Sequence, residues 1–320
     1  TFILGGLLFV GLALAAPVSA DDYVVNSVLD SPDGNLGDGV CDDGAGNCTL
    51  RAAIEQSNVV TTTADTIHFA IPSAGVHTIH VQSSLPPISS TVTIDALTQP
   101  GAACATAYLP AKLMVELDGS ATISPTNGLV LAIGTSASTI KGLVINRFPG
   151  SGVFINGSND NVVVCNHIGT NVAGTAALGN IFYGIYLQNS ANNLIGGDLP
   201  ADRNLVSGNG LHGIYVLSGE PEEALRSPDD DPPPGGGPSI NNRIAGNYIG
   251  ANASGVVDLG NTLSGVAIEG PGSDTNVVDG RNLIAGNDGN GVALLEGALA
   301  NTVANNLIGC LLYTSDAADE

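Results

Sequence analysis

A short apolar unit that recurs at nearly constant spacing is the feature that most restricts how this chain can fold. A glycine followed by an apolar, a variable and a second apolar residue occurs at Gly152, Gly184, Gly213, Gly265 and Gly291. The steps between these glycines are 32, 29, 52 and 26 residues, and an insertion at about 218–239 accounts for the long step. Units of the form Asn-Xaa-apolar-apolar lie between them. Each step therefore contains about three very short strands, each ended by Gly or Asn.

Strands of three or four residues are too short to form stable independent hairpins. They can instead stack on equivalent strands one coil above and one coil below, as in a parallel β-helix. Alternate Val, Ile and Leu side chains then fill the interior, while Gly and Asn supply the left-handed backbone at the corners. Stacked Asn side chains can bind the backbone of successive corners. We predict an all-β, right-handed parallel β-helix; the alternative, a β-sandwich, would need longer alternating strands.

The charge of the chain excludes two classes of partner. The formal net charge is -22, with 8 Lys and Arg against 30 Asp and Glu. So few cations cannot neutralise a phosphate backbone, so we expect no nucleic-acid binding. The same charge repels anionic membrane surfaces. The insertion at about 218–239 is rich in Pro, Gly and acidic residues, and this composition predicts a disordered surface loop.

The two ends of the chain differ from the repeat. An uncharged apolar run at 2–16 precedes Pro17 and a small-residue site that ends at Ala20, as in a secretory signal peptide. The run is shorter than the ~20 residues of a membrane span. We therefore predict an exported chain without a membrane span after residue 20. Residues 310–320 break the repeat and resemble a translated sequencing adapter, so we assign them no structural role.

Four cysteines remain once Cys310 is set aside with that terminal segment. Cys41 and Cys48 bracket a short loop, and in an oxidising compartment this arrangement favours a local disulfide. Cys165 follows three valines, an environment typical of a buried free thiol. A bridge between Cys104 and Cys165 is the alternative that the sequence leaves open.

The segment 48–58, CTLRAAIEQSN, predicts a helix. Thr49 is a suitable N-cap, and Leu50, Ala53 and Ile54 fall on one face. An amphipathic helix at this place can cover the apolar end of the first coil. We therefore divide the chain into a signal peptide (1–20), an N-terminal cap (21–64), β-helix repeats (65–309) and the terminal segment (310–320).

This segment resembles the N-terminal C-S-L-R-E-A-I signature of bacterial secreted proteins with right-handed parallel β-helix repeats. The similarity continues through DTIHF, LPPI and VTID, QPG, LDGS and the NxIGT and LGN units, and it covers nearly all of 23–309. Ala52 stands where the family pattern has Glu, which removes half of a capping box. The resemblance implies an exported, surface-associated solenoid of the pectin-lyase-like type, and it implies no established reaction.

An acidic stretch of the cap is the sharpest candidate for a metal site. Its oxygen-bearing side chains are Asp30, Asp33, Asn35, Asp38, Asp42 and Asp43. Calcium takes six to eight oxygen ligands, and clustered carboxylates between glycine turns can supply them. The order does not match an EF-hand, because Gly37 stands where a ligand is needed and no Glu closes the loop. A solvated acidic turn is the alternative.

Four further residues form the candidate catalytic set. Asp95 and Asp118 end two similar segments 23 residues apart, and in adjacent coils they would stack at about 4.8 Å. Such stacking would raise one pKa or recruit a cation, whereas two turn residues that accept corner N–H groups are the alternative. Lys141 and Arg147 supply the nearest basic side chains, as a polysaccharide lyase or hydrolase would need.

The remaining residues do not define an enzyme. His68 and His80 alternate with inward residues and should face outward, and the HExxH, GxSxG and phosphate-loop motifs do not occur. We therefore expect a secreted or cell-surface scaffold that is non-catalytic and adhesive or glycan-binding through its exposed faces. A carbohydrate-active lyase or hydrolase that acts on extracellular polysaccharide is the alternative.

Overall fold

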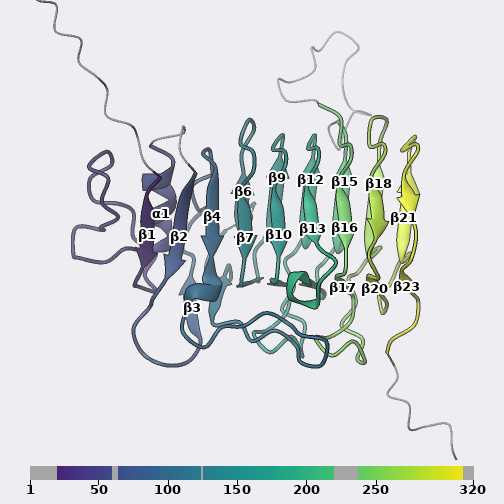
Figure 1. The fold of residues 1–320 in the computed structure, drawn as a ribbon, viewed down its shortest axis with the longest axis horizontal. Helices are drawn as coiled ribbons and strands as arrows, with labels where there is room; N and C mark the ends of the chain where they lie inside the picture. The colour runs from purple at the N-terminus through teal and green to yellow at the C-terminus, as the bar shows by residue number, and fades with distance from the viewer. Residues whose placement is uncertain (1–19, 60–63, 124, 220–236, 313–320) are drawn as a thin grey trace, which may run out of the picture.

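The computed structural model describes residues 20–59, 64–123, 125–219 and 237–312, and these residues form a right-handed parallel β-helix. Three sheets run along the long axis of the molecule, and the coils follow one another from the N-terminus to the C-terminus (Figure 1). Strands one coil apart pair in parallel, as β10 (Val162–Val164) does with β7 (Thr139–Lys141) and β13 (Leu194–Gly196). The predicted fold class is confirmed.

Each regular coil contributes one strand to each sheet. Sheet A contains β7, β10 and β13. Its other strands are β1 (Asp22–Val25), β2 (Asp65–Phe69), β4 (Val92–Asp95), β16 (Arg243–Ala245), β19 (Val277–Asp279) and β22 (Thr302–Val303). Sheet B contains β3 (His77–His80), β5 (Val115–Asp118), β8 (Leu143–Asn146), β11 (His167–Ile168), β14 (Leu205–Val206), β17 (Tyr248–Ile249), β20 (Leu283–Ile284) and β23 (Leu307–Ile308). Sheet C contains β6 (Leu129–Leu131), β9 (Val153–Asn156), β12 (Ile185–Gln188), β15 (Ile214–Leu217), β18 (Val266–Glu269) and β21 (Val292–Leu295). The five glycine-led units are the last five strands of sheet C, in register.

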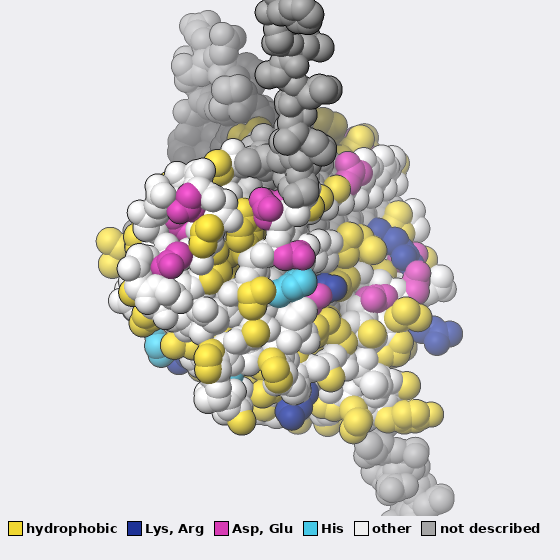
Figure 2. All heavy atoms as spheres, turned by 60° about the vertical axis from the view of Figure 1, so that its left-hand side comes forward, with side chains coloured by type: hydrophobic (Ala, Val, Ile, Leu, Met, Phe, Trp, Pro, Cys, Tyr) yellow, Lys and Arg dark blue, Asp and Glu magenta, His cyan; other side chains and the backbone are white. Residues whose placement is uncertain are grey.

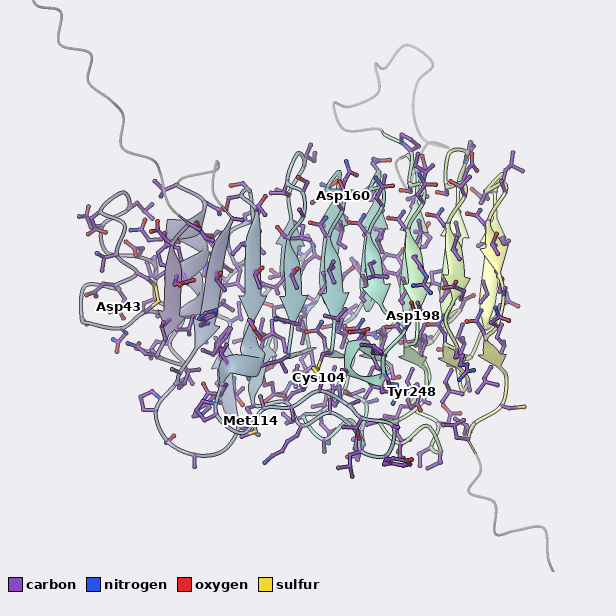
Figure 3. All side chains as sticks on the ribbon, viewed as in Figure 1. Asp43, Cys104, Met114, Asp160, Asp198 and Tyr248 are labelled. Carbon is purple, nitrogen blue, oxygen red and sulfur yellow. A yellow bond between two sulfur atoms is a disulfide. The ribbon has the colours of Figure 1, made fainter. Side chains whose placement is uncertain are left out.

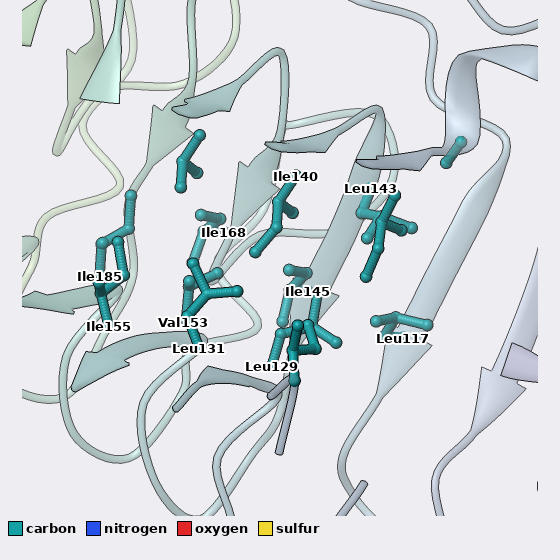
Figure 4. Close-up of a cluster of buried hydrophobic side chains, with 14 of the residues drawn as sticks. Leu117, Leu129, Leu131, Ile140, Leu143, Ile145, Val153, Ile155, Ile168 and Ile185 are labelled. Atoms are coloured by element: carbon teal, nitrogen blue, oxygen red, sulfur yellow. The ribbon is translucent and has the colours of Figure 1, made fainter. Parts of the chain in front are cut away.

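Aliphatic ladders fill the interior of the coils (Figure 4). Along β12, Ile185 and Leu187 are fully buried in this core, and Tyr186 between them therefore points outward, because successive side chains of a strand alternate in direction. Ile185 pairs with Val153 on one side and Ile214 on the other, so like side chains stack along the axis. Each such burial contributes about 1.5–3 kcal/mol.

Asparagines, most of them buried, form ladders at all three corners of the coil, as the sequence predicts. In each ladder the Nδ2 of one Asn donates to the Oδ1 of the Asn one coil further on, at 2.8–3.1 Å. The ladders are Asn161–Asn193–Asn242–Asn276–Asn301, Asn166–Asn204–Asn247–Asn282–Asn306 and Asn180–Asn209–Asn261–Asn287. The same Oδ1 atoms accept the backbone N–H of the preceding Asn, so the ladders satisfy corner groups that the sheets leave free.

The corner between sheets A and B is a single residue in the coil of β7 and β8. Gly142 occupies it with φ 82°, a conformation that costs energy for residues with a Cβ. A Cβ at this place would lie 2.7 Å from the backbone nitrogen of Leu97. Gly142 is therefore required both by its backbone conformation and by close packing against η1 (Ala96–Thr98). A second short 3₁₀ helix, η2 (Pro200–Asp202), precedes β14.

The helix α1 (Leu50–Ser57) covers the N-terminal end of the coils, as predicted. The Thr49 side chain accepts from the N–H of Ala52 and caps the helix. Leu50 and Ile54 join the same core as the inward residues of β1 and β2. Because β1 pairs with β2, sheet A begins at Asp22 rather than at the predicted repeat boundary of residue 65. The first strand of the cap is thus already part of the solenoid.

Two disulfides are present in the described residues. Cys41 pairs with Cys48, as predicted, and Cys104 pairs with Cys165. The expectation of a free Cys165 thiol is therefore wrong, because the loop at 99–113 folds back over sheet B and brings Cys104 to the A–B corner (Figure 3). Within the described ranges, no helix is long and apolar enough to cross a membrane. The predicted signal peptide up to residue 19 and most of the insertion (220–236) lie outside the described residues.

Candidate functional site

The structure separates the four candidate catalytic residues into two ion pairs. The Nζ of Lys141 lies 2.9 Å from the Oδ2 of Asp95 on the outer face of sheet A, and the Nε of Arg147 lies 2.9 Å from the Oδ1 of Asp118 at the end of β5. The predicted stacking of Asp95 on Asp118 is wrong: Asp95 pairs with Lys141 in sheet A, whereas Asp118 pairs with Asn146 in sheet B. The two ion pairs lie at opposite ends of β8. The length of this strand, four residues with a rise of about 3.3 Å each, separates them.

A buried polar network surrounds Asp118. The Nδ1 of His80 lies 2.9 Å from the Oδ2 of Asp118, and Asp118 also accepts from the N–H of Ser120. Glu116, two residues earlier on the same outward face, accepts from the Thr78 hydroxyl and from the Asn146 amide, each at 2.8 Å. His80 is exposed as predicted, but it belongs to this network, which sequence reasoning did not foresee.

This network stabilises charge rather than offering an open acid and base. Burial alone would raise the pKa of Asp118, but hydrogen bonds from Ser120 and the charges of Arg147 and His80 outweigh it and hold the pKa below its usual value. A general acid in glycoside cleavage needs the opposite shift. The side chains of Asp118 and Glu116 are 2% and 10% exposed, so a substrate has little access to either carboxylate.

The acidic residues of the cap bind the protein's own backbone and helix. Asp30 forms an ion pair with Arg51 at 2.8 Å, and Asp38 accepts from the amide of Gln56. Backbone N–H groups of the loop donate to the carboxylates of Asp33, Asp38, Asp42 and Asp43. Hydrogen bonds from the Asn47 side chain and the loop backbone lower the pKa of Asp43, which lies in a loop at the N-terminal edge (Figure 3).

The calcium site stays a prediction. Asn35 donates its amide to Asp38, so it turns a donor toward the carboxylate that it was predicted to join as a ligand. Among the residues that the structure describes, no three His, Cys, Asp or Glu side chains are grouped so that they could hold a metal ion. In the structure several of these residues accept hydrogen bonds from the turn backbone or anchor the helix, as the alternative of an acidic turn would have them do.

An aromatic cluster lies on the outer face of sheet C. It consists of Phe154, Tyr183, Tyr186, His212 and Tyr215. Tyr186 stacks on Phe154 with ring centroids 4.8 Å apart and on Tyr215 at 5.3 Å. Tyr183 lies across both tyrosines of the strands and stacks on His212 with the rings 5° from parallel.

Two rings of the cluster, Tyr215 and His212, form defined hydrogen bonds. Burial raises the pKa of Tyr215, and the nearby Glu269, to which Tyr215 is hydrogen-bonded, raises it further. Burial lowers the pKa of His212, and its Nδ1 accepts a hydrogen bond from the Ser264 N–H at 3.1 Å. The ring is therefore neutral near pH 7, with its proton on Nε2. Phe154, Tyr183 and His212 stay partly exposed, whereas Tyr186 and Tyr215 are buried.

Sequence reasoning missed this cluster although its signal was present. Three consecutive glycine-led units carry an aromatic residue at the variable position, namely Phe154, Tyr186 and Tyr215. In two of them the residue before the glycine is also a ring, Tyr183 or His212. Since the variable position faces outward, stacking of these rings across coils follows from the repeat itself.

Charged groups are sparse around the cluster. The described strands of sheet C contain no Lys or Arg, and Glu269 is their one acidic residue. Figure 2 shows a different side of the molecule, with the N-terminal end forward, where Asp and Glu side chains lie among hydrophobic and uncharged polar surface. Fold and site together define a parallel β-helix protein with buried, paired charges and an aromatic surface on one sheet.

Comparisons with known proteins add the following. No family model matches the chain, so the resemblance to the C-S-L-R-E-A-I proteins stays a prediction, and no curated protein matches it. Among solved structures, the A-module of the mannuronan C-5 epimerase AlgE6 of Azotobacter vinelandii aligns over 92% of this chain and 90% of its own, with 15% identity and a TM-score of 0.26. This similarity is too weak to support an inference about function.

Proposed function

We propose that the protein is a non-catalytic, extracellular β-helix scaffold that binds a glycan on the aromatic cluster of sheet C. The observation that supports this is the cluster of five contacting rings, of which Phe154, Tyr183 and His212 remain partly exposed. Sugars present apolar C–H faces next to hydroxyl groups. Amphipathic rings beside hydrogen-bonding groups match both features.

The charge distribution favours an uncharged glycan. A polyanionic chain would meet the Glu269 carboxylate and no basic side chain on the described strands of sheet C. It would also be repelled by the net charge of -22. An uncharged polysaccharide avoids both costs, and the rigid solenoid offers it a long surface.

An extracellular location is supported by the two disulfides, which form and persist in oxidising compartments. The predicted signal peptide at 1–20 gives the same expectation. The proposal holds for a released protein and for one held at the cell surface, since either location exposes sheet C to glycans.

The test is binding to a panel of uncharged and anionic polysaccharides by affinity gel electrophoresis. We expect retardation by an uncharged polysaccharide and roughly ten-fold weaker binding by Tyr183→Ala, which removes a ring that spans the cluster. Tyr108→Ala is the matched control, because Tyr108 is 94% exposed in a loop away from the cluster. Equal loss in both variants, or retardation by anionic polysaccharides alone, would contradict the proposal.

One observation favours the enzymatic alternative, a lyase or hydrolase. Glu116 and Asp118 place two carboxylates on one face of β5 beside Arg147, and carboxylate pairs are the machinery of glycoside cleavage. Their burial and the lowered pKa of Asp118 argue against this role. Release of reducing or unsaturated sugars from the same panel, lost in Asp118→Asn, would establish the enzyme and overturn the scaffold.

A further inference from the structure

An apolar groove lies under the loops that cover the N-terminal part of sheet B, away from the strands of sheet C. Its volume is about 800 Å³, within the range of small-molecule sites. The apolar residues that line it come from four separate segments and include Val76, Pro100, Ala111, Met114 and Val172. Met114, the one methionine of the chain, is a flexible side chain of the kind that adapts to different apolar ligands (Figure 3).

The groove is held open by fixed contacts of its walls. Ala103 and Lys112 pair their backbones in an antiparallel bridge at 2.8 Å in both directions, which closes the loop at 99–113 on itself. The neighbouring Cys104 is joined by its disulfide to Cys165 at the corner of the solenoid. The groove wall is thus tied to the sheet rather than free to collapse.

Lys112 lines this groove and has no acidic partner among the described residues. Most other basic side chains of the described residues are paired: Arg51 with Asp30, Lys141 with Asp95, Arg147 with Asp118, Arg243 with Asp198 and Asp279, and Arg203 over the ring of Tyr248. In the described chain, only Lys112 and Arg281 lack such a partner, and Arg281 lines a separate, polar cavity at the other end of the solenoid. A free cation beside an apolar groove is therefore unusual for this strongly acidic protein.

We propose that the groove binds a single-chain amphiphile with an anionic head group. Its alkyl chain lies against Val76, Met114 and Val172, and its head group lies beside the ammonium of Lys112. An uncharged apolar molecule would leave Lys112 without a partner, and a glycan would find few polar groups in the lining. The proposal does not depend on glycan binding, because the two surfaces share no residue.

The experiment is isothermal titration calorimetry of the full chain with decanoate, below its micelle concentration and near pH 7, where the carboxylate is ionised. We expect one molecule bound per chain. Hexanoate should bind roughly a hundred-fold more weakly, because it lacks four methylene groups. Decan-1-ol with the wild-type protein, and decanoate with Lys112→Ala, should each bind about five-fold more weakly than decanoate with the wild type.

Two tryptophan variants locate the site. Ala173→Trp places a large ring on the exposed rim of the groove and should abolish binding, whereas Ala107→Trp makes the same change at an exposed loop position outside the groove and should not alter it. Both positions are on the surface, so circular dichroism should show folded protein. Unchanged binding by folded Ala173→Trp would overturn the site. Equal affinity for decanoate and decan-1-ol would overturn the anionic head group.

Discussion

The rings of Tyr186 and Tyr215 stack with centroids 5.3 Å apart and planes 16° from parallel, on adjacent strands of sheet C. Parallel in-register pairing places equivalent side chains about one strand spacing apart, close to 4.8 Å. That spacing is also a favourable stacking distance for aromatic rings. The backbone of the solenoid therefore sets the geometry of the aromatic cluster, and the rings reinforce the register in turn.

We predict that Tyr186→Leu lowers the free energy of unfolding by about 1–2 kcal/mol, because leucine keeps apolar contact but loses stacking on both neighbours. Guanidinium chloride unfolding followed by circular dichroism measures this change. Tyr108→Leu is the matched control, since that side chain is 94% exposed and surface substitutions change stability by only about 0.5 kcal/mol. A similar effect at both positions would show that the stack contributes nothing to stability.

The contribution of the asparagine ladders to the free energy of unfolding should also be measurable. Asn247 is fully buried, donates to Asn282 and to the carbonyl of Ile195, and accepts from Asn204. Asn247→Ala leaves several of these buried groups unsatisfied, at about 1–3 kcal/mol each, so we expect a loss of at least about 3 kcal/mol in chemical unfolding. Asn35→Ala, at an exposed site of the cap, should change stability by under about 1 kcal/mol. A loss no larger than that of the control would contradict the role assigned to the ladder.

The fold could be predicted because its causes are local and repeated. Glycine and asparagine at fixed intervals specify the corners, and alternating apolar residues specify the interior, so the five units from Gly152 onward placed sheet C correctly. The first coils are less regular. There the loop at 99–113 lengthens the chain between β4 and β5, so the 23 residues from Asp95 to Asp118 lead into the next sheet rather than to the next coil.

The candidate sites depended on contacts between distant segments, and these were less predictable. The Cys104–Cys165 bridge and the approach of His80 to Asp118 join residues that are 61 and 38 positions apart. Composition alone also does not reveal that carboxylates of the acidic loop accept hydrogen bonds from its backbone N–H groups. The aromatic cluster was readable from the repeat, since Phe154, Tyr186 and Tyr215 share one position in successive units.

Stability should depend on pH through His167. This side chain is buried in sheet B, where burial lowers its pKa from 6.5 to about 4. Between these values the unfolded chain binds a proton that the folded chain does not, so stability is full above pH 6.5 and falls as the pH drops toward 4. The shift corresponds to roughly 3 kcal/mol.

His167→Leu should remove this part of the acid sensitivity, because Leu205 already occupies the equivalent position in the next coil. Chemical unfolding at pH 7.5 and pH 4.5 measures the difference for both proteins. We expect the wild type to lose more stability than the variant between the two pH values. Parallel losses would assign the acid sensitivity to other groups.

The ion pair of Arg147 with Asp118 should contribute much more to stability than the ion pair of Lys141 with Asp95. Arg147→Met leaves the buried carboxylate of Asp118 without its guanidinium and should cost about 1–3 kcal/mol at pH 7. The backbone at position 147 is left-handed (φ 59°). Methionine is similar in length to arginine and also has a Cβ, so the substitution leaves the backbone strain unchanged. Lys141→Met removes the partner of the more accessible Asp95 and should cost under about 1 kcal/mol.

The pH dependence of Arg147→Met provides a second check. Arg147 helps to hold the pKa of Asp118 below its usual value, so the stability that it contributes is present above the ordinary pKa of an aspartate and is lost as Asp118 takes up its proton in acid. The difference between wild type and Arg147→Met should therefore be largest near neutral pH and shrink below about pH 4. A constant difference down to pH 3 would mean that Arg147 acts through the packing of its side chain rather than through its charge.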